Sequence, residues 1–113
     1  MKTINFVRDF TVTPGGRYKS DGKFSGELFR ERHLLPCLES DDNVTIDIDG
    51  VAGFPSSFLE EAFGGLFRER PGLDLKVTLD KFRITTSDPD LQYYVGLIRQ
   101  YMTEAARKAL VAA

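Results

Sequence analysis

The sequence predicts an α/β fold in which helices cover a small mixed sheet. Three observations carry this prediction. Apolar and polar residues alternate over 44–49, which is the period of a strand with one buried face. Apolar residues recur every three or four positions over 58–67 and over 91–109, which is the period of amphipathic helices. Strands that alternate with helices along a chain are typical of a layered α/β architecture.

The central strand and the loop after it organise the rest of the chain. Val44, Ile46 and Ile48 share one strand face, so we expect them to be buried, with Asp47 and Asp49 outside the core. Two glycines and a proline over 50–55 then predict a tight loop. A helix follows from about residue 57.

A capping box predicts the start of this central helix. Ser57 is followed three residues later by Glu60, a spacing at which each side chain can accept from the other residue's backbone amide. Gly64 and Gly65 are expected to let the helix pack closely on the sheet or on the last helix, with approach of a partner's backbone as the alternative. The buried face consists of two columns, Phe58, Ala62 and Leu66 and, beside them, Leu59, Phe63 and Phe67.

The region before the central strand contains a strand and a helix. Alternation over 4–12 predicts a first strand, ended by Pro14. Ser25 is expected to cap a helix, with Glu27 in its first turn, where the helix dipole favours an acid. Pro36 should end or kink that helix.

The region after the central helix contains a further strand and the last helix. The strand is predicted from alternation over 73–79, and Phe82 and Ile84 could extend it. Asp88 and Pro89 are a capping acid and a first-turn proline, so they predict a helix start. The apolar side of that helix consists of Leu91, Tyr94, Val95, Ile98, Met102, Ala105 and Ala109. We expect Leu91, Val95, Ile98 and Met102 to be buried against the sheet.

Length and composition exclude several classes of protein. The chain has 113 residues, which fits one domain, and a net charge of −2, which does not favour nucleic-acid binding. No stretch approaches the roughly 20 apolar residues of a membrane span, and no signal peptide is expected. Cys37 is the only cysteine, so no internal disulfide can form, which suits a cytoplasmic location.

Chemical motifs are weak when they are considered one by one. Asp47 and Asp49 share a strand face and could bind Mg²⁺ together, as in a phosphatase. The glycine-rich region near Arg17 does not match the spacing of a phosphate-binding loop. His33 has no nucleophile motif and Cys37 no spaced partner ligand, so neither a catalytic triad nor a zinc site is expected, and no cofactor is predicted.

Several motifs together resemble a small bacterial STAS-like family of unknown function. The motifs are Pro14-Gly-Gly-Arg17, Asp21-Gly22, Ser25-Gly-Glu27 and Ser56-Ser-Phe-Leu-Glu-Glu-Ala-Phe-Gly-Gly-Leu66. The segment 44–66 is also similar to the core of STAS domains, the fold of sulfate transporters and anti-sigma-factor antagonists, in which the central helix typically starts Asp-Ser-Ser/Thr-Gly-Leu. The resemblance covers nearly the whole chain and implies one STAS-like domain over 1–113.

The resemblance implies a non-enzymatic regulatory domain that binds another protein, as a partner-switch component acting with a histidine-kinase-like ATPase would. Ser56 matches the position of the usual phospho-acceptor, although Pro55 replaces the family's Asp and Phe58 its Gly. Ser57 is a second phosphorylation candidate, and simple helix capping is the alternative for both serines. The expected partner-binding residues are Phe54, Ser56, Ser57, Phe58 and Glu61, with Arg17 as a possible anion or loop contact.

Two other functions stay open at this point. The first is a module that binds a small ligand such as a nucleotide and would use Arg17 and the start of the central helix. The second is a Mg²⁺-dependent phosphatase-like enzyme that would use the pair Asp47 and Asp49.

Overall fold

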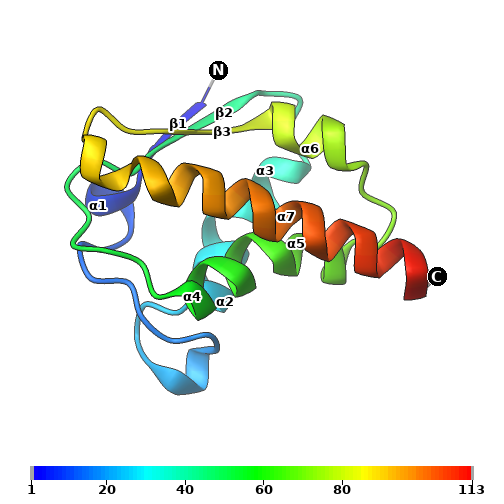
Figure 1. Ribbon diagram of the computed structural model, residues 1–113, viewed down its shortest axis with the longest axis horizontal. Helices are drawn as coiled ribbons and strands as arrows, with labels where there is room; N and C mark the ends of the chain where they lie inside the picture. Colours follow the sequence, from blue (N-terminus) through cyan, green and yellow to red (C-terminus); the bar gives the residue numbers. More distant parts are fainter. Residues whose placement is uncertain (1, 113) are drawn as a thin grey trace.

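The computed structural model describes residues 2–112 and contains a three-stranded sheet. The strands are β1 (Lys2–Asn5), β2 (Val44–Asp47) and β3 (Phe82–Thr85), with β2 in the middle and both neighbours parallel to it. Figure 1 shows the strands along the upper edge of the molecule, with most of the helices below them. The α/β class is confirmed, and the sheet is purely parallel where a mixed sheet was expected.

Helices connect the strands and cover one face of the sheet. The segment between β1 and β2 contains α1 (Phe6–Asp9), the 3₁₀ turn η1 (Lys19–Asp21) and a helix over 26–38 made of α2 (Gly26–Phe29), the π turn η2 (Arg30–Leu34) and α3 (Leu35–Leu38). The central helix over 56–69 is made of α4 (Ser56–Leu59), the π turn η3 (Glu60–Gly64) and α5 (Gly65–Glu69). The last elements are α6 (Leu75–Lys81) before β3, then η4 (Pro89–Leu91) and α7 (Gln92–Ala112).

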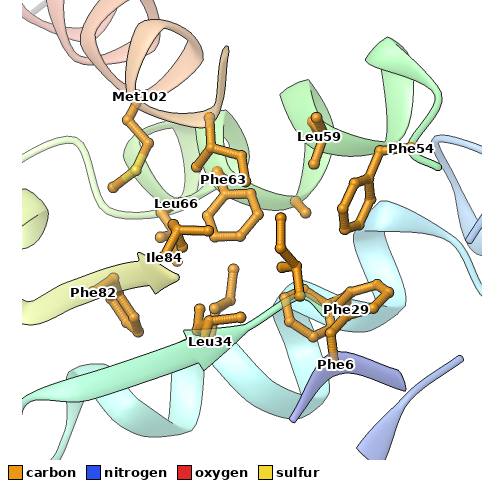
Figure 2. Close-up of a cluster of buried hydrophobic side chains, with 14 of the residues drawn as sticks. Phe6, Phe29, Leu34, Phe54, Leu59, Phe63, Leu66, Phe82, Ile84 and Met102 are labelled. Carbon is orange, nitrogen blue, oxygen red and sulfur yellow. The ribbon is translucent and has the colours of Figure 1, made fainter. Parts of the chain in front are cut away.

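The core lies between the sheet and the central helix, as the central strand predicts. Val44, Ile46 and Ile48 are buried, whereas Asp47 and Asp49 lie outside the core and are partly exposed. Figure 2 shows residues of the central helix, β3, α1 and α2 converging on one cluster. Both predicted columns of the central helix are buried, so the apolar pattern was sufficient to identify its inner face.

The first strand is shorter than predicted because a helix begins inside the alternating segment. The Asn5 side chain accepts from the Arg8 amide at 2.9 Å, and Asp9 accepts from the Asn5 amide at 2.8 Å. This reciprocal cap ends β1 and starts α1. Phe6 and Phe10 therefore lie one helical turn apart, with ring centroids 5.6 Å apart.

The strand predicted over 73–79 is wrong. Asp74 accepts from the Val77 amide at 2.9 Å and caps α6, so this segment is helical. Side chains at a helical spacing, Leu75, Thr78 and Leu79, then face the protein, and Val77 is 65 % exposed. The strand of this region is β3, the segment that had been considered only as an extension.

The predicted caps at Ser25 and Asp88 are confirmed. The Ser25 hydroxyl accepts from the Leu28 amide at 3.1 Å, and Asp88 accepts from the Asp90 amide at 2.9 Å. Pro36 does not end its helix, which continues to Leu38. The π turn directly before it supplies the irregularity, because such a turn widens the helix where a proline ring would otherwise clash with the preceding turn.

The last helix packs mainly on the central helix, where the sequence predicted the sheet. Leu91, Ile98 and Met102 are buried as expected, and Val95 is half-buried. At the edge of the sheet, residues of α7 and β3 line a common groove. No helix among residues 2–112 is long and apolar enough to cross a membrane.

Candidate functional site

The start of the central helix differs from the capping box that the sequence predicts. The helix begins at Ser56, its N-cap residue is Pro55, and no side chain caps it. Glu60, the predicted partner of Ser57, is instead bound by Arg17 and Arg68. The capping box is therefore absent, because the helix begins at Ser56 and Ser57 lies inside its first turn, where it cannot be the N-cap residue.

The two serines differ in exposure. Ser56 is exposed and Ser57 is half-buried. Neither hydroxyl caps the helix, so the structural role that would have explained these serines is missing. Ser56 therefore presents a hydroxyl to solvent at the positive end of the helix dipole.

The loop before the helix is held against the core by Phe54. Its ring lies 5.0 Å from that of Phe6 and 5.2 Å from that of Tyr94, measured between centroids. Phe58, one turn into the helix, is fully buried. Both phenylalanines, expected as partner contacts, are thus core residues that position the loop. The accessible side chains of the predicted site are those of the two serines between them.

The outer side of the central helix carries a network of arginines and glutamates. Arg17 donates to Glu60 at 2.5 Å and lies 3.3 Å from Glu61, so it joins the loop over 10–24 to the helix. Arg68 binds the same carboxylates, at 2.7 Å from Glu60 and 3.3 Å from Glu61. Asp21, in the same loop, accepts from the Tyr18 amide at 2.9 Å.

The innermost pair of this network is buried. Arg30 is 5 % exposed and Glu61 6 % exposed, and their ion pair measures 2.9 Å. Arg30 also donates to the Glu61 carbonyl and, at 2.8 Å, to Glu69. A buried pair of this kind is stable only when its hydrogen-bonding groups are satisfied, as they are here. Glu61, expected as a partner contact, is thus enclosed by three arginines.

Glycines make room for the network and for the helix packing. A Cβ atom at Gly65 would overlap the Arg30 guanidinium, and one at Gly64 would lie 3.4 Å from the Ala105 Cβ of α7. A Cβ at Gly26 would overlap the Phe58 carbonyl. Gly64 thus lies against α7, one of its expected neighbours, but the atom nearest to its added Cβ would be the Glu60 Oε2 at 2.7 Å. Gly65 accommodates an arginine that the sequence did not suggest.

The charges of the network shift the pKa values of its members. Burial raises the pKa of Glu60, but hydrogen bonds from Arg68 and Arg17 outweigh burial, so the pKa of Glu60 lies below its ordinary value. The hydrogen bond that Arg17 donates to Glu60 raises the pKa of Arg17. These groups therefore stay charged at neutral pH.

The pair Asp47 and Asp49 stabilises loops. Asp49 accepts from the Thr86 hydroxyl at 2.5 Å and from the Ser87 amide and hydroxyl at 2.8 and 2.7 Å, which ties β2 to the loop after β3. These bonds, that from Thr86 first, lower the pKa of Asp49. Asp47 accepts from the Asp49 amide at 2.9 Å. In the described part of the chain, no group of three or more His, Cys, Asp or Glu residues has the geometry to hold a metal ion.

Sequence reasoning missed Arg30, Arg68 and Glu69. Arg30 and Glu61 both lie in π turns, which shift side chains relative to a regular helix, so helical spacing alone could not pair them. One signal was available. Two adjacent glycines inside a helix indicate that a bulky group lies against the backbone, and a buried arginine is such a group.

A comparison with protein-family models finds one match, over residues 25–92. Its description is "STAS-like domain of unknown function (DUF4325)". The matched region runs from the Ser25 cap through the charge network and β3 to the first residue of α7. No curated protein and no solved structure gives a significant match.

Proposed function

Because the chain belongs to the STAS-like domain family of unknown function, we propose that it is a non-enzymatic regulatory domain that binds another protein through the start of its central helix. The observation that carries this proposal is the exposed Ser56. Ser56 is the first residue of the central helix, and its hydroxyl has no capping role in the fold. A change at Ser56 can therefore alter the surface without altering the core.

The proposed surface consists of Val12, Ala52, Pro55, Ser56 and Tyr93, and we call it the helix-start surface. Val12 is 45 % and Tyr93 70 % exposed, so both offer apolar area to a partner. The Ala52 amide donates to the Val12 carbonyl at 2.9 Å, and Tyr93 contacts Tyr94, whose ring packs on Phe54. These contacts hold three segments together around the loop.

Ser56 is the proposed switch of this surface, with Ser57 as the secondary candidate. A phosphate at Ser56 would add negative charge where the helix dipole favours it. The neighbouring carboxylate of Glu60 is already neutralised by Arg17 and Arg68. Phosphorylation would then mainly lower the affinity for the partner, because binding would bury the new charge. The proposed partner is a histidine-kinase-like ATPase in the cytoplasm, which would also be the source of the phosphate.

Binding and mass measurements test this proposal. The chain is incubated with a purified histidine-kinase-like ATPase and with ATP, and its intact mass is measured. One added phosphate, lost in Ser56→Ala, is expected. Ser56→Asp is expected to weaken binding about tenfold or more, or about 1.4 kcal/mol.

The matched control is Ser20→Asp, which adds the same charge at another exposed serine. It should leave affinity unchanged. If no phosphate is added and Ser56→Asp binds like wild type, the helix start is not a switch. If Tyr93→Ala and Val12→Ala also leave affinity unchanged, the helix-start surface is not the binding site.

A further inference from the structure

A second candidate interaction surface lies at the β3 edge of the sheet, one of its two edges, away from Ser56. The strand order β1-β2-β3 leaves the outer side of β3 without a neighbouring strand among the described residues. Beside it is a groove with a volume of about 220 Å³, between β3 and α7. Its walls include Ile84 of β3 and Val95, Arg99 and Met102 of α7. Figure 2 shows Ile84 and Met102 on the same side of the core, from these two elements.

The backbone of β3 is oriented to accept another strand. The Thr85 carbonyl accepts from the Ile48 amide at 3.0 Å, so Thr85 faces β2. Because N–H and C=O groups alternate sides along a strand, those of Ile84 face the free edge. The Phe82 amide, on the same side, donates to the Thr78 carbonyl and ends α6. The open hydrogen-bonding groups are therefore centred on Ile84.

The charges around the groove indicate what would bind there. Arg83 and Arg99 both line it, both are exposed, and neither has an ion pair within residues 2–112. The acid at the same groove, Asp80, is paired with Lys76 at 3.3 Å. The groove thus combines two uncompensated positive charges with an apolar wall that includes the half-buried Val95.

We infer that the β3 edge binds an extended acidic segment of a partner protein, which adds to the sheet as a fourth strand beside Ile84. The alternation of strand side chains specifies its pattern. Residues on the inner face of the sheet would contact Val95 and should be apolar, whereas residues on the outer face would lie beside Arg83 and should be acidic. Backbone hydrogen bonds supply affinity, and the two arginines supply the preference for acidic sequences.

The test uses a synthetic peptide of alternating Glu and Val, about eight residues long, the length of an ordinary strand. Its binding is followed by NMR with amide hydrogen exchange. We expect saturable binding, weaker at high salt, and exchange at the Ile84 amide slowed about tenfold or more. The Arg83 amide, which faces β2, should keep its exchange rate. N-methylation of the peptide at one set of alternate residues should abolish binding, while methylation of the other set should not.

Charge variants complete the test without touching the core. Arg83→Glu combined with Arg99→Glu should weaken binding about tenfold or more. Arg107→Glu, an exposed arginine elsewhere on α7, should leave it unchanged, as should Ser56→Asp. Failure of the peptide to bind at millimolar concentration would overturn the inference, and so would equal binding of an alternating Lys-Val peptide. Protection of the Ile84 amide in a dimer without peptide would assign the edge to a second copy of the chain instead.

Discussion

At the residue scale, glycines decide how closely the helices approach. Gly26 lies where the helix over 26–38 meets the central helix, and both atoms nearest to its missing Cβ are backbone atoms, the Phe58 carbonyl and the Ala62 amide nitrogen. Backbone atoms cannot rotate aside as a side chain can. The two helices approach closely at this point, and this brings Arg30 to Glu61. The absence of a Cβ atom at Gly26 therefore permits the buried ion pair.

The first prediction compares two glycines in helices. Gly26→Ala should destabilise the protein by about 1–3 kcal/mol, because the two helices must move apart. Gly96→Ala, in the middle of α7 with nothing within 4 Å of its added Cβ, should stabilise it by about 1 kcal/mol. Urea denaturation of both variants measures the difference. Equal effects at the two positions would mean that the helix contact at Gly26 can relax.

The second prediction concerns pH. The folded-state pKa of Glu60 lies below its ordinary value of 4.5, so its charged form stabilises the fold. This contribution is fully present above the ordinary value and is lost as pH falls through the lower folded-state pKa. Glu60→Gln should therefore be less stable than wild type at pH 7, and the difference should shrink at acidic pH. A constant difference across the pH range would exclude a role for its ion pairs.

At the element scale, the helix caps distinguish Ser25, which stabilises the fold, from Ser56 and Ser57, the candidates for phosphorylation. Ser25 is fully buried and its hydroxyl accepts from the Leu28 amide, whereas Ser57 makes no cap bond. The same residue type at two helix starts thus has two roles. The difference arises because Ser25 is the N-cap residue of its helix, whereas the central helix begins at Ser56 and Ser57 lies inside its first turn.

The third prediction follows from these caps. Ser25→Ala should lower the free energy of unfolding by about 0.5–2 kcal/mol. Ser57→Ala should change the free energy of unfolding by less than about 0.5 kcal/mol. A capping box at Ser57 would instead imply a larger loss. Chemical denaturation of the two variants provides the comparison. A loss of about 1 kcal/mol at Ser57 would show that its hydroxyl does support the helix.

The fourth prediction concerns α7. Ile98 is fully buried between α7 and the rest of the core, so Ile98→Ala should cost about 2–5 kcal/mol. Leu110→Ala, in the same helix at a position that is 75 % exposed, is the control and should fall within about 0.5 kcal/mol of wild type. A similarly small loss at Ile98 would place α7 at the periphery of the fold.

At the scale of the whole molecule, only one face of the sheet packs against the core. The inner face consists of buried aliphatic and aromatic residues, and the outer face carries polar side chains such as Thr45 and Asp47. Parallel sheets are usually covered on both faces. Here the alternating pattern keeps the outer face polar, so the small sheet needs helices on one face alone.

The fifth prediction is that this arrangement unfolds as one unit. The buried apolar residues form one continuous cluster that includes all strands, the central helix and α7. We therefore expect far-UV circular dichroism and tyrosine fluorescence to report the same urea midpoint, with a slope of about 1–3 kcal/mol per molar. Separate midpoints would mean that the N-terminal loop or α7 unfolds independently.

The sequence alone determined the fold class, the central strand, the inner face of the central helix and the start of the last helix. Each depends on local periodicity or on a cap within three residues, so the pattern around Val44 or Asp88 contained the answer. It did not determine the conformation of 73–79, because a cap at Asp74 outweighed the alternation of its apolar residues.

Only the tertiary structure decided the partners of Arg17, Arg30 and Glu61 and the parallel order of the strands. The Arg30–Glu61 pair joins residues 31 positions apart through two π turns, and the Arg17–Glu61 pair spans 44 positions. Contacts at such separations depend on how helices pack in three dimensions, and no local period encodes them. The same packing turned the expected contacts Phe54 and Phe58 into core residues and left Ser56 exposed.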